Sequence, residues 1–181
     1  MTTKRTILMS ALLCLLTLTT KAQYAEYEIK AAYIFNFAKF IEWPETETTP
    51  SDSIYLCIYQ KDPFGVILEK TMVGRTANGK SWSIKRINSL KEVTKCHILV
   101  IPDISQHNVT KLLKEIGNKP ILTIGDEIPN FCNLGGIVNF TPQMSKCQFE
   151  MNNDVACGNR IRINPKLLQL AKIISNKEDE F

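Results

Sequence analysis

The sequence predicts an α/β fold, a single three-layer domain with a mostly parallel sheet and one antiparallel hairpin. From Ile54 onward, short apolar segments with strand character alternate with helical segments, which is the order expected of a parallel sheet covered by helices. Two further strand-like segments, Ile137–Thr141 and Lys146–Met151, are separated only by a short turn at Pro142–Ser145 and predict the hairpin. The length of 181 residues and the hydrophobic content of 44% are ordinary for one globular domain.

The N-terminus has the pattern of a secretory signal peptide. Lys4 and Arg5 precede an apolar run from Ile7 to Leu18, and small residues stand before an expected cleavage site after Ala22. The apolar run is shorter than the roughly 20 residues that a membrane-spanning helix needs. We therefore predict a signal peptide at residues 1–22 and an exported domain at residues 23–181, with an uncleaved anchor as the alternative.

Export changes the charge and cysteine arguments. Residues 1–22 carry three basic residues and no acid, so their removal lowers the net charge from +4 to +1 and leaves no basic patch for a nucleic acid. Five of the six cysteines remain, and cysteines pair in an oxidising compartment. An odd number leaves one thiol unpaired or bonded between chains.

The first half of the domain reads as four elements. A helix is predicted over Ala25–Glu42, ending before Pro44 because the residue that precedes a proline disfavours the helical conformation. A strand over Ile54–Tyr59 follows. Asp62 and Pro63 are typical of a helix start, and that helix is expected to reach about Thr71. The alternating pattern of Ser81–Ile87 predicts the next strand.

The second half continues the alternation. We expect a buried strand at His97–Ile101, a helix at Ser105–Ile116 that Gly117 ends, and a short strand at Pro120–Ile124. After the hairpin come a short helix at Asn153–Cys157 and an extended segment at Ile161–Ile163. A final helix, capped by Asn164, is expected at Asn164–Ile174.

The helix before Pro44 has more apolar residues than one buried face requires. A helix that is apolar nearly all round either lies deep in the core or buries a second face against a partner. Aromatic residues are enriched at the centres of interfaces. We predict Phe37, Phe40 and Trp43 as part of a partner-binding or dimer surface, with plain core packing as the alternative.

Three cysteines lie in or near the predicted hairpin. Gly136 is expected opposite Met151, which brings Cys132 and Cys157 to the same end of the two strands. Cys147 lies near the turn, roughly 13 Å along the strand from Met151 at 3.3 Å per residue. This arrangement favours a Cys132–Cys157 disulfide, and Cys147–Cys157 remains the alternative.

No catalytic, metal or cofactor site is predicted. The adjacent residues Cys96 and His97 point to opposite faces of a strand and form no catalytic pair. His97 and His107 are the only two histidines, which is a poor inventory for zinc. No nucleophile-elbow, phosphate-loop or metal motif is present.

Four segments resemble the YfiR family. They are K-A-A-Y-I-F-N-F-A-K-F-I-E-W-P at 30–44, G-G-I-V-N-F at 135–140, F-E-M-N at 149–152 and I-N-P-K-L-L-Q-L-A at 163–171. The resemblance implies a periplasmic α/β protein, dimeric in its type member. Such a protein binds the periplasmic part of an inner-membrane diguanylate cyclase and represses it, which limits cyclic di-GMP and biofilm formation.

The resemblance also implies a disulfide between Cys57 and Cys96. The type member has a second bridge in the Cys132 region, but Asn139 stands at the matching second position here and puts that bridge in doubt. Two other functions remain open. One is an envelope protein that captures a small molecule or cell-wall fragment near residues 125–136, and the other is a thiol protein that uses the unpaired cysteine.

Overall fold

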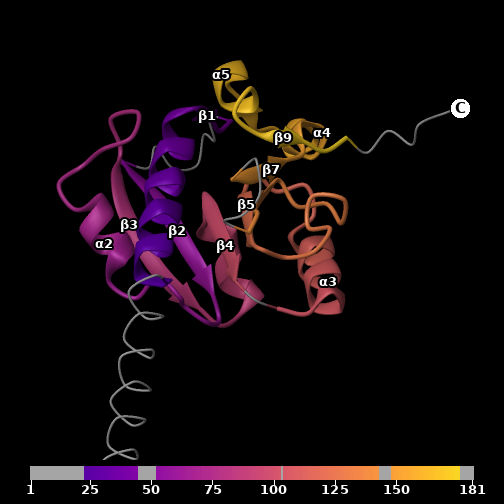
Figure 1. Ribbon diagram of the computed structural model, residues 1–181, viewed down its shortest axis with the longest axis horizontal. Coiled ribbons are helices and arrows are strands. Elements are labelled where there is room, and N and C mark those ends of the chain that lie inside the picture. Colours follow the sequence, from indigo (N-terminus) through magenta and orange to yellow (C-terminus); the bar gives the residue numbers. More distant parts are fainter. Residues whose placement is uncertain (1–22, 45–51, 103, 143–147, 176–181) are drawn as a thin grey trace, which may run out of the picture.

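The computed structural model describes residues 23–44, 52–102, 104–142 and 148–175 (Figure 1). The predicted signal peptide at residues 1–22 lies outside this part, as do Cys147 and most of the predicted hairpin turn.

The described residues form a seven-stranded sheet in the order β3-β2-β4-β5-β6-β7-β9. Every neighbouring pair is parallel except β6 and β7, which are the antiparallel hairpin. The predicted fold class is therefore confirmed. The strands are β2 (Ser53–Tyr59), β3 (Ser81–Ile87), β4 (Ile98–Pro102), β5 (Leu122–Asp126), β6 (Val138–Phe140), β7 (Phe149–Met151) and β9 (Lys172–Ile173).

Side chains of the central strands alternate between two buried layers, because successive residues of a strand point to opposite faces of the sheet. In β4, Ile98 and Val100 face one hydrophobic cluster, whereas Leu99 and Ile101 face the other. The register pairs Val100 with Ile124 of β5. All five residues of β4 are buried, which explains its continuous apolar run.

Helices cover both faces and complete the three layers. The N-terminal helix (residues 23–39) and α2 (Ile67–Met72) pack on the first face. Helix α3 (Gln106–Ile116) and the 3₁₀ helix η1 (Leu90–Lys95) pack on the second. Figure 1 shows the indigo N-terminal helix and α3 on opposite sides of the sheet.

The first helix ends three residues earlier than predicted. Residues after 39 leave the helix, and β1 (Ile41–Glu42) pairs antiparallel with β8 (Arg162–Ile163). The backbone amide of Asn164 also donates to the carbonyl of Phe40. A distant segment thus supplies hydrogen bonds that the helix would otherwise have made with itself, and local sequence does not reveal such a partner.

The predicted final helix is wrong beyond its first turn. Only α5 (Pro165–Leu168) is helical, and the chain then forms β9. The backbone amide of Ile174 donates to the carbonyl of Met151, so the open edge of β7 takes up the segment as a strand. The helix expected at Asp62 also begins later, at Ile67, because Gly65 adopts a positive φ of 55° that a helix cannot contain.

Between β7 and β8 lies α4 (Asn153–Gly158), close to the predicted position. The side chain of Asn152 caps it by accepting a hydrogen bond from the backbone amide of Val155. Asparagine is among the preferred residues at this position.

Candidate functional site

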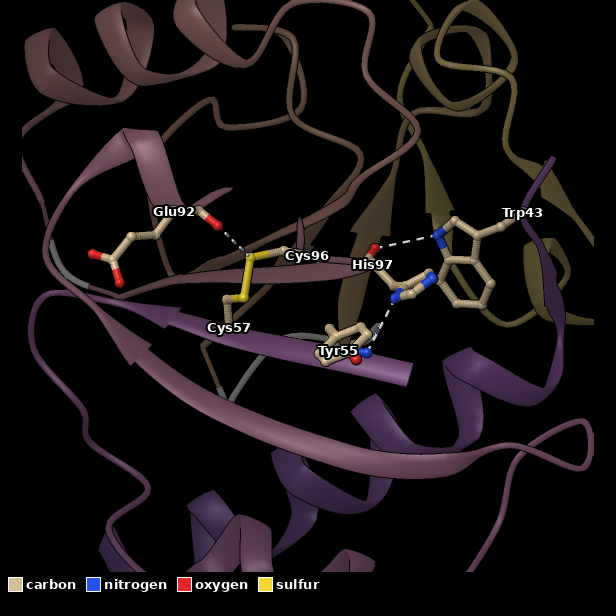
Figure 2. The surroundings of a disulfide bond; sticks show 6 residues. All are labelled: Trp43, Tyr55, Cys57, Glu92, Cys96 and His97. Carbon is tan, nitrogen blue, oxygen red and sulfur yellow. Dashed lines mark hydrogen bonds between the residues drawn. A yellow bond between two sulfur atoms is a disulfide. The ribbon is translucent and has the colours of Figure 1, made fainter. Parts of the chain in front are cut away.

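A disulfide joins Cys57 of β2 to Cys96, the residue that follows η1. Their Cα atoms are 5.9 Å apart, and the two cysteines are 39 residues apart in the sequence. Both side chains are buried beside the second hydrophobic cluster. The sulfur of Cys96 lies 3.8 Å from the carbonyl oxygen of Glu92 (Figure 2). The bridge that the resemblance implied is therefore present in the structure.

His97 points away from the disulfide and anchors an aromatic group. Its Nδ1 accepts a hydrogen bond of 3.1 Å from the backbone amide of Tyr55, and its ring stacks on that tyrosine (Figure 2). Trp43 Nε1 donates to the carbonyl of His97 at 3.2 Å. Burial, with a smaller effect of Lys80, lowers the pKa of His97, so the imidazole is held in its neutral form.

The three aromatic residues predicted for a partner surface have different environments. Phe37 is completely buried and packs against Phe140 and Phe149, so the prediction of an interface role for it is wrong. Phe37 lies on the side of the N-terminal helix that packs against the sheet, so its ring points into the core. Trp43 is half-buried, and Phe40 is 36% exposed. Of the three, Phe40 is the most accessible to a partner.

A buried lysine joins the N-terminal helix to the carboxyl end of β5. Lys30 Nζ lies 2.6 Å from Asp126 Oδ1 and 3.0 Å from Glu127 Oε1, and it also contacts Glu26. Tyr27 donates its hydroxyl hydrogen to the other oxygen of Asp126. Burial alone lowers the pKa of Lys30, but its hydrogen bonds to Asp126 and Glu26 raise the pKa above the usual range.

Sequence reasoning missed this cluster. In the sequence, Lys30 stands out only as part of the YfiR-like motif at 30–44, and Asp126 and Glu127 only as part of the loop region at 125–136. The two ends of the ion pair are 96 residues apart. A signal was nevertheless present, because a lysine followed by two alanines in an apolar helix is a charge that needs a partner when it is buried.

The loop between β5 and β6 is held by a side chain of β6 and by one of its own side chains. The Asn139 side chain accepts from the backbone amide of Ile128 and donates to the carbonyl of Ile128. The ring of Phe131 fills the space beneath Gly136, where a Cβ atom would collide with it. Gly135 adopts a positive φ of 101°, a conformation that glycine permits. These contacts account for the two glycines of the sequence motif.

An open hollow of about 370 Å³ lies beside this loop, at the carboxyl ends of β5 and β6. Ligands of open α/β sheets commonly bind outside the carboxyl ends of the strands. The lining is mixed, with Phe140 and Pro129 among polar side chains that include Asn130, Asn133 and Glu127. Such a surface offers hydrogen bonds to a polar ligand and an apolar face for it to rest on.

The described residues contain no helix long and apolar enough to cross a membrane. Within the same part of the chain, no group of three His, Cys, Asp or Glu side chains is arranged to hold a metal ion. A model of the YfiR/HmsC-like family matches residues 27–172, well over half of the sequence.

The chain belongs to the YfiR/HmsC-like family. No curated protein matches it. The region matched by the YfiR/HmsC-like family includes the disulfide, the pair of Lys30 and Asp126, and the loop with its two glycines. Of the site residues named above, only Glu26 lies outside the family domain.

The second disulfide predicted for this YfiR/HmsC-like domain, between Cys132 and Cys157, is absent. Both residues are free thiols. Cys132 is fully buried in the second hydrophobic cluster, where its sulfur lies 3.8 Å from the carbonyl of Ile137. Cys157 is exposed on α4. The strands pair Val138, and not Gly136, with Met151, so the expected register was also wrong. Burial raises the pKa of Cys132 to about 12.

Proposed function

We propose that this protein is a periplasmic regulator that binds the periplasmic part of an inner-membrane signalling enzyme, a diguanylate cyclase, and represses it. The observation that carries the proposal is the match to the YfiR/HmsC-like family over residues 27–172. The disulfide between Cys57 and Cys96 supports it, because such bonds persist in oxidising compartments. The predicted signal peptide at residues 1–22 supports the same location.

The chemistry of the described residues favours binding over catalysis. The half-buried histidine His97 accepts a hydrogen bond at Nδ1 from the backbone amide of Tyr55. Lys30 is held by three carboxylates, and the thiol of Cys132 is kept protonated by burial. These three groups hold the fold together, which supports surface contacts as the means of action.

Phe40 is the proposed contact residue for the sensor. It lies between the end of the N-terminal helix and β1, and the Trp43 side chain is held by its hydrogen bond to the carbonyl of His97. An exposed aromatic residue on a rigid support is a typical interface anchor. Phe40 and Trp43 of the predicted partner surface thus remain in the proposal. Phe40 is the proposed contact, and Trp43 supports the surface around it.

The experiment is deletion and complementation in the native bacterium. Deleting the gene should raise cellular cyclic di-GMP, and the wild-type gene should restore it. The Phe40→Ala variant should restore it less well, whereas Val73→Ala, a change at an exposed valine that follows α2, should restore it fully. Pull-down with the exported protein should recover a membrane-bound cyclase. Unchanged cyclic di-GMP together with no captured membrane protein would reject the proposal.

The open hollow favours a second candidate, capture of a small polar ligand such as a cell-wall fragment. Its position at the carboxyl ends of parallel strands and its asparagine-rich lining support this function. Calorimetric titration with soluble peptidoglycan fragments tests it. Binding that weakens in Asn133→Ala and persists in Asn108→Ala, a change on the exposed face of α3, would support capture. No heat of binding with any fragment would count against it.

A further inference from the structure

One edge of the sheet has no strand beside it in the described part of the chain. The strand at this edge is β3, whose neighbour on the other side is β2 (Figure 1). Its seven residues keep an unbroken register with β2, from Ser53 opposite Ser81 to Tyr59 opposite Ile87. The strand at the opposite edge, β9, has two residues. Edge strands commonly avoid pairing with another chain by being short, bulged or interrupted by proline, and β3 has none of these features.

The pairing with β2 identifies the backbone groups that face outward. The amide of Ser81 and the carbonyl of Ile87 bond to the residues that flank β2. Since alternate residues of a strand bond to the same parallel neighbour, the N–H and C=O groups of Trp82, Ile84 and Arg86 point away from β2. Among the described residues, no backbone hydrogen bond outside the sheet reaches these groups. They form an edge that another strand can complete.

The side chains of β3 divide this edge into an apolar face and a basic face. Trp82 and Ile84 are half-buried against the first hydrophobic cluster. Lys85 is exposed and lies on the opposite face, because it pairs with Cys57 of the second cluster. Its ammonium group lies 5.3 Å from the centre of the Tyr55 ring and has no carboxylate partner within the described segments.

Arg86, the other charged residue of β3, is held against α2. Its guanidinium group bonds to Asp62, to Glu69 and to the carbonyl of Gly65. Lys85 is therefore the cation that a strand added at this edge meets. A second copy of β3 would bring another lysine to the same face, whereas a segment with carboxylates on that face pairs with Lys85.

We propose that β3 binds an extended segment of another protein as an additional strand of the sheet. The main chain of the segment bonds to the outward groups of Trp82, Ile84 and Arg86, a mode of recognition called β-augmentation. Because residues of a strand alternate between the two faces, its acidic side chains lie beside Lys85 and its apolar side chains lie beside Trp82 and Ile84. The partner segment therefore alternates acidic and apolar residues.

This inference goes beyond the proposed repression of a cyclase and uses a surface other than Phe40. Its tests use the exported protein and synthetic peptides, so a failure here leaves sensor binding through Phe40 untouched. A failure of the cyclase experiment likewise leaves strand addition untouched.

Amide hydrogen exchange followed by NMR tests strand addition. The probe is a short peptide of alternating glutamate and valine, blocked at both ends. At saturation it should slow exchange of the Trp82, Ile84 and Arg86 amides at least about tenfold. The amide of Lys85, which already faces β2, should change little.

Two controls accompany the exchange experiment. The same peptide with every amide N-methylated cannot donate main-chain hydrogen bonds and should have no effect on exchange. Unchanged exchange at Trp82, Ile84 and Arg86 with the unmodified peptide overturns the proposal. Protection that appears when the protein alone is concentrated also overturns it, because the occupant would then be a second copy.

Charge exchange at Lys85 tests the chemistry of the segment. In titration calorimetry, Lys85→Glu should bind the glutamate peptide at least about threefold more weakly than the wild type, because an attraction becomes a repulsion. The same variant should bind a lysine–valine peptide more tightly than the wild type does. Lys111→Glu changes an exposed lysine of α3 and should bind both peptides as the wild type does. Equal affinities of the wild type and Lys85→Glu for the glutamate peptide would overturn the assignment of an acidic segment.

Discussion

The ammonium group of Lys30 lies 2.6 Å from Asp126 Oδ1, with both side chains buried. This contact fixes the N-terminal helix to the carboxyl end of β5, next to the loop that borders the open hollow. Glu26 and Glu127 surround the same lysine, and Tyr27 bonds the second oxygen of Asp126. One cation therefore contacts three carboxylates, and it is the ionic partner of the one that is buried, Asp126.

Replacing the cation should destabilise the protein strongly. Lys30→Met leaves Asp126 buried without its partner, and breaking a buried ion pair in this way typically costs about 3 kcal/mol or more. Urea unfolding followed by circular dichroism measures the loss in the free energy of unfolding. Lys111→Met, at an exposed position of α3, is the control and should change stability by less than about 0.5 kcal/mol. A loss below about 1 kcal/mol for Lys30→Met would mean that the pair contributes little.

A methyl group at Gly136 should be poorly tolerated. The added Cβ would collide with the fully buried ring of Phe131, and overpacking of this kind costs about 1–3 kcal/mol. Thermal unfolding of Gly136→Ala should show a lower midpoint than the wild type. Gly158→Ala is the matched control because nothing lies within 4 Å of the position that its methyl group would take. Equal midpoints for the two variants would contradict the close contact.

Removing the disulfide should lower stability by about 3–4 kcal/mol, the loop-closure value for its 39-residue separation. The double variant Cys57→Ala/Cys96→Ala tests this in urea unfolding. A reductant should then destabilise the wild type but have no effect on the double variant. Cys157→Ser removes an exposed free thiol and should leave the free energy of unfolding unchanged. If the reductant destabilised both proteins equally, a different bond would be responsible.

His97 should make the protein less stable in mild acid. Its pKa is lowered in the folded state from an ordinary value of 6.5. The unfolded chain therefore binds a proton below that pH while the folded chain does not, so the stabilisation present above about pH 6.5 is lost as the pH falls. The free energy of unfolding should decrease less between about pH 7.5 and about pH 5.5 in His97→Asn.

The control is an exposed, uncharged residue of α3. Asn108→Ala should keep the wild-type pH dependence because it removes no titratable group. Identical pH profiles for His97→Asn and the wild type would show that burial of the imidazole does not contribute to acid sensitivity.

The sequence alone determined the central fold. The strands β2, β3 and β4 and the helix α3 agree with prediction to within a residue or two, because each buries a regular apolar pattern and α3 ends at Gly117. The antiparallel hairpin and the position of α4 were also predicted from local patterns. Such signals depend on neighbours along the chain, which any single sequence displays.

Only the tertiary structure decided the features that join distant segments. Ile173 became part of a strand because β7 had an open edge, and Ile41 became part of another because β8 lies beside it. The same holds for the site, since the ion pair of Lys30 and Asp126 spans 96 residues. Cys132 faces the core while Cys157 faces solvent, so nearness along the hairpin did not make them partners. Packing in three dimensions sets the burial and orientation of these side chains, and the local sequence pattern does not determine them.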